Sequence, residues 1–545
     1  MLGPVIETIS TDTSSIVIRS EAARRRTFAI ISHPDAGKTT LTEKLLLYSG
    51  SLELAGSVRA RKGGRQTTAD WLAIEQERGI TVTSTSIQFD HGGCRFNLLD
   101  TPGHQDFSED TYRTLMAADG AVMVLDASRG IERQTLKLFK VCRMRRIPIV
   151  TFINKLDHPS REPLGLLDEI EEVLGLQAAP MNWPIGDGVA FQGVYDLEER
   201  KVLRYTRTER GERRAPEIEG DLGSAELDSA LGDIAAARIG EEIELLQATG
   251  AVFDRDRFLA NDQTPVFFGS ALTNFGVKPF LDALVDLLPP PAARLTEAEG
   301  FLEDRTDFSG FVFKIQANMD PRHRDRMAFV RVCSGRFYKD MEVFNPRLGR
   351  KVRLTRPHQL FAQERSAAEE AFPGDIVGLI NPGLFAIGDT LYDGEPVQFP
   401  PIPRFAPEWF GRLENQDTGR HKQFFKGVAQ LEEEGAVQVF YPVQGGREPI
   451  LAAVGELQID VIVARLESEY GVKSSVYPLP FSAATWIEGD RTAIDSLNLR
   501  SRGSLRAEDL NGRPVALFNA DWDLRLAEDA HPDVRFKRIG DIETM

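Results

Sequence analysis

The stretch SHPDAGKT, Ser32 to Thr39, decides the fold because of what stands on either side of it. The apolar run before it, Phe28 to Ile31, is typical of a buried strand, and after it the apolar residues from Leu41 to Tyr48 recur at helical spacing until Gly50. A Gly-Lys-Thr turn between a strand and a helix presents backbone N–H groups and a helix N-terminus, both of which bind phosphates. The stretch therefore predicts a phosphate-binding loop after the first strand of an α/β domain.

Further strands are expected because short apolar runs alternate with helical patterns, and this alternation predicts a parallel, doubly wound sheet. These runs are Phe96 to Leu99, Ala121 to Leu125, Ile147 to Ile153 and Pro265 to Phe268. About a hundred residues separate Asp157 from Pro265, far more than a crossover helix needs. They contain a strand-like stretch, Val189 to Tyr195, and a helical one, Ile239 to Thr249, so we expect an inserted subdomain.

Changes of pattern along the chain predict the domain boundaries. Three prolines, Pro289 to Pro291, end the last helix of the first domain. From Phe308 the apolar period becomes two with frequent turn signals, as in a small antiparallel barrel, and the proline-rich linker Pro400 to Pro407 closes it. The fold class expected is multidomain α/β. Its parts are a lead-in over 1–24, the phosphate-loop domain over 25–291 with its insert over 158–264, a β-barrel over 300–396 and an α+β domain over 408–545.

The amino-acid composition limits the cellular locations and the kinds of partner that can be expected for this chain. The 545 residues carry a formal charge of −17, which disfavours indiscriminate coating of nucleic acid, DNA included. The three cysteines, Cys94, Cys142 and Cys333, are too few and too far apart for a disulfide framework or a zinc site. No signal peptide or apolar run long enough to span a bilayer is apparent. We therefore expect a cytoplasmic protein, without membrane contact and monomeric.

The second motif is DTPGH, Asp100 to His104, which directly follows an apolar run. Asp100 is therefore expected at the carboxyl end of a strand, where open sheets bind ligands. In such a site Lys38 reaches the β- and γ-phosphates, the Thr39 hydroxyl binds Mg²⁺, and Asp100 holds that ion through water. The Gly103 N–H meets the γ-phosphate, and a glycine there lets the backbone change conformation when that phosphate leaves.

The third motif is NKLD, Asn154 to Asp157, again at the end of an apolar run. The Asp157 carboxylate can accept hydrogen bonds from both N1–H and the 2-amino group of guanine, whereas adenine offers no such pair. Such paired bonds reject the wrong partner by about 10⁴-fold to 10⁵-fold, which favours GTP over ATP. The tripeptide Ser270-Ala271-Leu272 follows the next run, and we expect a backbone N–H there to contact the guanine oxygen.

The predicted GTP or GDP site therefore draws on four segments of the chain. Its residues are Ser32, His33, Pro34, Asp35, Ala36, Gly37, Lys38, Thr39 and Thr40, then Asp100, Thr101, Pro102, Gly103 and His104, then Asn154, Lys155, Leu156 and Asp157, and finally Ser270, Ala271 and Leu272.

These four motifs, in this order, resemble those of the translational GTPases, the superfamily of elongation factor G. The wording SHPDAGKTTLTEKLLL, Ser32 to Leu47, is similar in particular to the family of bacterial peptide chain release factor 3. The likeness extends to ERGIT, Glu77 to Thr81, which resembles the first switch. It also extends to the third domain of that family through LEEEGAVQVF, Leu431 to Phe440, through Val454 to Val472 and through Asp523 to Phe536.

The resemblance implies roles that the spacing of residues does not. Thr81 would bind Mg²⁺ and the γ-phosphate only in the GTP state, and His104 would be the catalytic residue that positions the attacking water. The implied partners are the ribosome, with its RNA and proteins, and class-I release factors bound to it. The implied activity is a ribosome-stimulated GTPase that promotes dissociation of a class-I factor after peptide release, during translation termination.

Two basic clusters are candidate contacts for ribosomal RNA phosphates, although solvated surface charge explains each equally well. The first cluster stands near the first switch and consists of Arg59, Arg61, Lys62 and Arg65. The second belongs to the predicted barrel and consists of Arg322, Arg324, Arg326 and Arg331.

Three other functions compete with this interpretation. An elongation-factor-like or ribosome-protection protein needs a further domain that reaches the decoding centre, and only about seventy residues follow Val472. A GTP-bound scaffold without hydrolysis is disfavoured by Thr81 and His104. An ATP-driven motor or kinase is disfavoured by Asn154 and Asp157.

Overall fold

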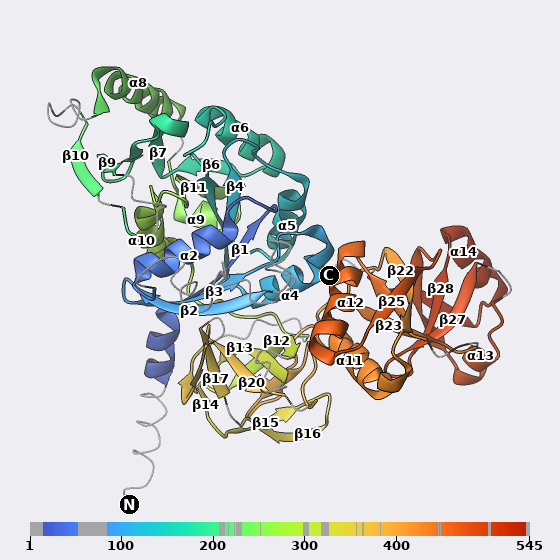
Figure 1. Cartoon of the computed structure of the whole chain (residues 1–545). Coiled ribbons are helices and arrows are strands. Elements are labelled where there is room, and N and C mark those ends of the chain that lie inside the picture. The colour runs from blue at the N-terminus through green and yellow to red at the C-terminus, as the bar shows by residue number, and fades with distance from the viewer. Residues whose placement is uncertain are drawn as a thin grey trace, which may run out of the picture.

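The computed structural model describes residues 15–52, 84–206, 213–215, 217–222, 224, 231–250, 252–297, 305–317, 326–355, 357–361, 364–381, 383–444, 446, 448–499 and 503–540. Figure 1 shows three parts: an α/β part up to residue 297, an antiparallel part from 305 to about 399 below it, and a C-terminal part in orange and red to one side. A short helix over residues 15–23 precedes the first strand. The predicted mixed α/β fold is confirmed.

The α/β part is built on seven strands in the order β2-β3-β1-β4-β5-β11-β6, parallel throughout except that β2 is antiparallel to β3. They are β1 (Arg25–Ser32), β2 (Thr85–His91), β3 (Cys94–Asp100), β4 (Gly120–Asp126), β5 (Ile149–Asn154), β6 (Gln177–Pro180) and β11 (Gln263–Phe268). The predicted parallel, doubly wound sheet is therefore present.

Helices cover both faces of this sheet because its strands are apolar on both sides. In β1, Phe28 and Ile30 enter one apolar cluster while Ala29 and Ile31 enter another. The first face carries α2 (Lys38–Ser49) and α10 (Val277–Leu287), and the second carries α4 (Ser108–Ala117), α5 (Arg133–Met144) and α6 (Pro163–Leu174). The short helices are η2 (Gln105–Phe107) and α9 (Arg255–Leu259).

The region expected as an insert, 158–264, is divided between two sheets. Its strand β6 extends the main sheet beside β11, while a separate antiparallel sheet has the order β10-β9-β8-β7. The elements of the second sheet are β7 (Asn182–Ile185), η3 (Gly188–Ala190), β8 (Gly193–Asp196), β9 (Lys201–Tyr205), β10 (Glu217–Asp221) and the nearby helix α8 (Asp233–Thr249).

The strand expected from Val189 to Tyr195 is shorter than predicted. Gly188 has φ +56°, a left-handed conformation that interrupts an extended chain, so Val189 lies in a 3-10 turn and is almost fully exposed. The domain boundaries given above stay a prediction.

The middle part is antiparallel, with strands in the order β16-β15-β21-β12-β13-β20-β17 around an apolar core that includes Val312, Val330 and Leu379. One backbone pair, Phe361 with Ile87, joins β17 to β2 of the α/β part. The strands are β12 (Ser309–Ala317), β13 (Arg326–Ser334), β14 (Phe337–Tyr338), β15 (Glu342–Asn345), β16 (Arg350–Arg353), β17 (Pro357–Phe361), β18 (Glu364–Ala367), β19 (Glu370–Ala371), β20 (Ile376–Ile380) and β21 (Thr390–Tyr392).

The C-terminal part is one antiparallel sheet, β25-β22-β24-β23-β27-β28-β26-β29, with helices packed on it. Its strands are β22 (Trp409–Asn415), β23 (Gln438–Pro442), β24 (Ile450–Ala453), β25 (Ser474–Pro478), β26 (Ala483–Gly489), β27 (Ser504–Asp509), β28 (Pro514–Phe518) and β29 (Val534–Arg538). Its helices are η5 (Thr418–Arg420), α11 (His421–Glu433), α12 (Glu456–Tyr470), α13 (Arg491–Asp495) and α14 (Asp521–Ala530). Figure 1 shows α11 and α12 on the side that faces α4 and β12.

Among the residues that the structure describes, every helix is too short or too polar to cross a bilayer.

Candidate nucleotide-binding site

The loop between β1 and α2 has the left-handed backbone that a tight phosphate turn needs. Gly37 caps α2 with φ +91°, and a Cβ at this position would lie 2.4 Å from Nδ2 of Asn154. Glycine is therefore required at position 37 for two reasons, the left-handed backbone angle and the close approach of the Asn154 side chain. The N-terminus of α2 opens directly onto this turn, so its partial positive charge is available to a phosphate.

Lys38 joins the loop to the second motif. Its Nζ lies 3.2 Å from Oδ1 of Asp100 and donates to the carbonyl of Thr101. Lys38 and Asp100 are both buried: Asp100 is the last residue of β3, and Lys38 is the first residue of α2, which follows the neighbouring strand β1. The Lys38 ammonium group is thus held at the carboxyl edge of the sheet, beside the phosphate-binding loop.

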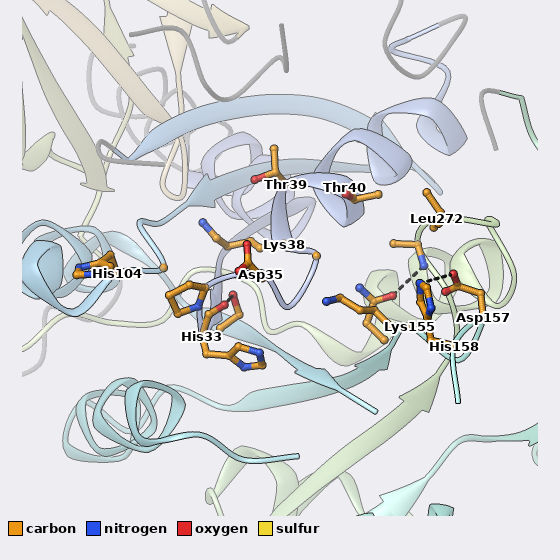
Figure 2. A pocket seen from close by; sticks show the side chains of 16 residues that line it. His33, Asp35, Lys38, Thr39, Thr40, His104, Lys155, Asp157, His158 and Leu272 are labelled. Atoms are coloured by element: carbon orange, nitrogen blue, oxygen red, sulfur yellow. Dashed lines mark hydrogen bonds and ion pairs between the residues drawn. The ribbon is translucent and has the colours of Figure 1, made fainter. Parts of the chain in front are cut away.

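A cavity of about 450 Å³ lies beside this turn, and the first, second, third and fourth motifs all contribute to its wall (Figure 2). Its lining residues are Ser32, His33, Pro34, Asp35, Gly37, Lys38, Thr39, Thr40, Gly103, His104, Asn154, Lys155, Asp157, His158, Ala271 and Leu272.

Several predicted site residues lie behind this wall rather than in it. They are Ala36, Asp100, Thr101, Pro102, Leu156 and Ser270, all of them buried. Thr81 lies outside the described residues. One lining residue, His158, was missed, although its place directly after Asp157 in the sequence NKLDH was the signal that could have found it.

One end of the cavity is organised by Asn154. Its Nδ2 donates to the carbonyl of Ala36 at 2.8 Å, and its Oδ1 accepts from the N–H of Ala271 at 2.9 Å. The Asp157 carboxylate accepts from the Ser270 hydroxyl at 2.6 Å. These bonds bring the first, third and fourth motifs together and leave a carboxylate at the wall, which is the arrangement that guanine recognition requires.

Lys155 follows Asn154 in a left-handed conformation, with φ +70°. Its Nζ lies 2.9 Å from Oδ2 of Asp126 at the end of β4. Burial alone would raise the pKa of Asp126, but hydrogen bonds from Ser128 and Lys155 outweigh it and lower the pKa to about 2. The ion pair therefore persists over the whole physiological pH range and holds the third motif against β4.

His33 is the buried imidazole of the loop. It is 1% exposed, and its Nε2 lies 3.4 Å from Oε1 of Glu132. Neither ring nitrogen makes a hydrogen bond within the described part of the chain. Burial lowers the pKa of His33, so the ring is neutral at pH 7.

His104 stands at the other end of the cavity. Its Nδ1 accepts from the backbone N–H of Asp106 and lies 3.3 Å from both that nitrogen and Oδ1 of the Asp106 side chain. Figure 2 shows the ring at the margin of the site, apart from Lys38 and Thr39.

The donor chemistry near the loop fits Mg²⁺. Thr39 contributes a hydroxyl and Asp100 a carboxylate, both hard oxygen groups. Across the described residues there is no group of three or more His, Cys, Asp and Glu side chains able to hold a metal. A hydroxyl and a carboxylate would suit Mg²⁺, which proteins hold through one or two carboxylates together with substrate phosphates.

The prediction for the second basic cluster is wrong at Arg331. This guanidinium is 1% exposed, and it donates to Asp119 and to the carbonyl of Gly374. Arg326 donates to Glu433 of the C-terminal part. The remaining members of both clusters, Arg59, Arg61, Lys62, Arg65, Arg322 and Arg324, lie outside the described residues.

Comparison with protein families divides the chain into three matched stretches. The model of the elongation factor Tu GTP-binding domain matches residues 23–290, and that of elongation factor G domain 2 matches residues 307–394. The model of the C-terminal domain of class II release factor RF3 matches residues 399–528.

Individual proteins agree with this assignment. Peptide chain release factor 3 of Gloeobacter violaceus is 55% identical, over 96% of this chain and 99% of that protein. The factor of the same name from Acaryochloris marina is 53% identical, over 94% and 95%. A crystal structure of a Thermus thermophilus protein shares the fold, with a TM-score of 0.68 at 23% identity over 89% of this chain and 72% of that one. The chain is a translational GTPase and belongs to the peptide chain release factor 3 family.

Proposed function

We propose that the chain binds the ribosome with GTP after peptide release, promotes dissociation of the class-I release factor and then hydrolyses GTP to leave. In this proposal it works as a monomer in the cytoplasm, without membrane or DNA. The observation that carries it is 55% identity to a named peptide chain release factor 3 over nearly the full length of both chains.

The base of the nucleotide is read at the end of the cavity near Asn154. The Asp157 carboxylate accepts from N1–H and the 2-amino group of guanine, and the Ser270 hydroxyl holds that carboxylate in place. The N–H of Ala271 or Leu272 meets the guanine oxygen. ATP is excluded because adenine would leave the buried carboxylate without its two donors.

The phosphates lie on the turn from His33 to Gly37, over the N-terminus of α2. Lys38 contacts the β- and γ-phosphates as a point charge. Thr39, Asp100 and, in the GTP state, Thr81 would hold Mg²⁺, which would supply positive charge to offset the negative charge that develops on the phosphates.

His104 positions the attacking water. The water oxygen attacks the γ-phosphorus in line with the bridging oxygen to the β-phosphate, that bond breaks, and GDP and phosphate leave. Because phosphoryl transfer depends mainly on positioning and charge stabilisation, a ribosome that orders His104 is expected to accelerate hydrolysis by about 10³-fold to 10⁵-fold.

The decisive experiment measures phosphate release from GTP by the purified chain, alone and with ribosomes that carry a labelled class-I factor after peptide release. We expect ribosome-stimulated hydrolysis together with faster loss of the label. Stimulated hydrolysis without faster loss would keep the GTPase and reject the role in termination, in favour of another ribosomal function. Selective protection by GDP over ADP tests the base-reading residues independently.

A further inference from the structure

The exposed face of helix α5 carries positive charge without compensating carboxylates. Arg133, Lys137 and Lys140 are exposed and stand four and three residues apart, so they form one row along the helix, which we call the α5 basic stripe. From Arg133 to Arg146 the sequence has six basic residues and no acidic one, in a chain whose net charge is −17. Figure 1 shows α5 at the margin of the α/β part. The stripe is therefore an accessible surface of unusual charge.

The packing of α5 does not require these charges. The opposite face of the helix, with Leu138, Phe139 and Cys142, is buried in the apolar core of the α/β part. Within the part of the chain that the structure describes, none of the three stripe residues forms an ion pair. Helix α10 shows the more usual arrangement, because Lys278 lies 3.1 Å from Asp282 one turn further on.

The stripe also works against the stability of the helix. Arg133 is the first residue of α5, where the partial positive charge of the helix N-terminus disfavours a cation. The carboxylate of Glu132, the residue before the helix, lies beside Arg129 and His33. The other two stripe residues follow one turn apart, and like charges at that spacing repel each other. An arrangement that lowers helix stability points to a role outside folding.

The chemistry of the stripe fits a row of phosphates better than a protein surface. The centres of protein interfaces are rich in aromatic side chains and poor in lysine. On α5, all of whose residues are described, Met144 is the one large apolar side chain that is exposed, and no exposed side chain is aromatic. The stripe therefore offers nothing on which an unpaired base could stack. It spans about 10 Å of helix, and each of its cations can neutralise a phosphate and release a counterion.

The stripe begins beside the nucleotide cavity. Oε1 of Glu132, which directly precedes Arg133, lies 3.4 Å from Nε2 of His33. His33 belongs to the phosphate-binding loop and lines the cavity. A partner bound along α5 would therefore lie next to the site at which the ribosome stimulates hydrolysis.

We propose that the α5 basic stripe binds the phosphate backbone of ribosomal RNA. Its three cations neutralise phosphates when the chain docks on the ribosome, and this contact relieves the repulsion between like charges along α5. The stripe contacts phosphates rather than bases, so it contributes affinity and orientation without reading a sequence. This inference rests on the proposed function, which supplies the ribosome as the partner.

The test compares two full-length triple variants in their binding to purified ribosomes over a series of salt concentrations. Arg133→Gln/Lys137→Gln/Lys140→Gln removes the charge and should bind about tenfold more weakly, or worse, at about 0.1 M salt. Its plot of log affinity against log salt should be shallower by about two, because three phosphates no longer release their counterions. Arg133→Lys/Lys137→Arg/Lys140→Arg is the matched control: it keeps the charge and should keep the wild-type affinity and slope.

Two further measurements show whether the neutral variant is intact. Its GDP affinity should equal that of the wild type, because no stripe residue lines the nucleotide cavity. Its unfolding midpoint should not fall, because the substitutions remove like charges that repel each other. If the triple variant does not fold, the single variant Lys137→Gln tests the same contact through a slope change of about one.

Three results would overturn the inference. The first is a neutral variant with the wild-type affinity and salt slope. The second is a charge-keeping variant that binds as weakly as the neutral one, since shape rather than charge would then matter. The third is a photoreactive side chain at position 137 that crosslinks, on the ribosome, to protein rather than to RNA.

Failure of the proposed function would look different. If the wild type binds ribosomes and hydrolyses GTP but does not hasten loss of the labelled class-I factor, the role in termination fails, while the salt slope still decides on the stripe. If the factor is released but the neutral variant binds like the wild type, only the stripe is overturned. A wild-type chain that does not bind ribosomes would reject both.

Discussion

Polar side chains have opposite roles in the nucleotide cavity and in the junction, the region near α4 where α11 and α12 of the C-terminal part meet β12. In the cavity, the Lys38 ammonium and the Asp157 carboxylate stand at a wall open to a ligand. At the junction, charges are buried against protein partners, as in the pair of Glu434 and Arg465 within the C-terminal part. The first arrangement presents charge to a ligand, whereas the second uses charge to fix how three parts of one chain meet.

The pair of Glu434 and Arg465 illustrates the second arrangement. Arg465 donates to Glu434 at 2.8 Å and to Glu469 at 2.6 Å, and Glu434 also accepts from the N–H of Ala317 at the end of β12. Although burial opposes its charge, the attraction of the two carboxylates raises the pKa of Arg465 well above its usual value. Helix α12, the end of α11 and β12 are thereby joined by one network.

The largest effect is expected in the cavity, from Asp157→Asn. The side-chain amide of asparagine would place an N–H donor against the N–H donors of guanine, so at least one of these donors would lose its acceptor. GDP affinity should therefore fall by about 10⁴-fold. Titration with a fluorescent GDP analogue measures this loss. Xanthosine diphosphate, whose oxygen replaces the 2-amino group, should bind the variant better than GDP does.

Ser270→Ala is the control for Asp157→Asn because it keeps the carboxylate and removes only the hydrogen bond that orients it. It should cost about 1 kcal/mol of binding free energy. Equal losses in the two variants would mean that Asp157 acts through loop structure rather than through the base.

The next effect concerns the junction. Glu434→Ala leaves the buried guanidinium of Arg465 with only one carboxylate and should lower the stability of the C-terminal part by about 3 to 5 kcal/mol. Thermal unfolding followed by calorimetry measures it. The double variant Glu434→Met/Arg465→Met should recover much of the loss, because an apolar pair of similar volume needs no charge partner. A fully stable Glu434→Ala would show that the pair contributes nothing to the stability of the C-terminal part.

The residues that meet at the nucleotide cavity could be predicted from the sequence, whereas those that meet at the junction could not. The four motifs each follow an apolar strand, and parallel strands bring their carboxyl ends to one edge, so their meeting around one cavity could be expected from the order of elements alone. The roles given to Thr81 and His104 came only from resemblance and stay predictions.

The junction could not be expected in this way. Asp106 meets Leu457 across 351 residues, and no local period connects them. Arg331 shows the same difficulty within a strand: the alternation in β13 gives its face, but it does not reveal that Asp119 covers that face. Contacts between different parts of the chain depend on how those parts pack together, and this packing leaves no periodic pattern in the sequence.

A smaller effect at the junction depends on pH. Burial raises the pKa of Glu432 from 4.5 to about 7. Between these two values the folded chain keeps a proton that the unfolded chain has lost, so stability falls as pH rises, by at most about 3 kcal/mol. Glu432→Gln should abolish this decline and raise the unfolding midpoint at pH 8 but not at pH 4.5. A pH profile identical to that of the wild type would contradict the raised pKa.

The smallest effect is expected when the ion pair at the cavity wall is broken, and it is to be compared with the effect of breaking the ion pair at the junction. Lys155 retains 31% of its side-chain exposure beside Asp126, so solvent screens the pair, and Asp126→Asn should cost only about 1 kcal/mol of GDP binding free energy. The loss should be the same at pH 5 and pH 8, because the pKa of Asp126 is about 2 and the carboxylate stays charged at both. Ser128→Ala, which removes a hydrogen bond to Asp126 but keeps its charge, serves as the control in the same GDP titration. A loss of about 3 to 5 kcal/mol, the size expected for Glu434→Ala, would contradict the distinction between the two regions, since it would make an exposed pair at the cavity wall as costly to break as a buried pair of the junction.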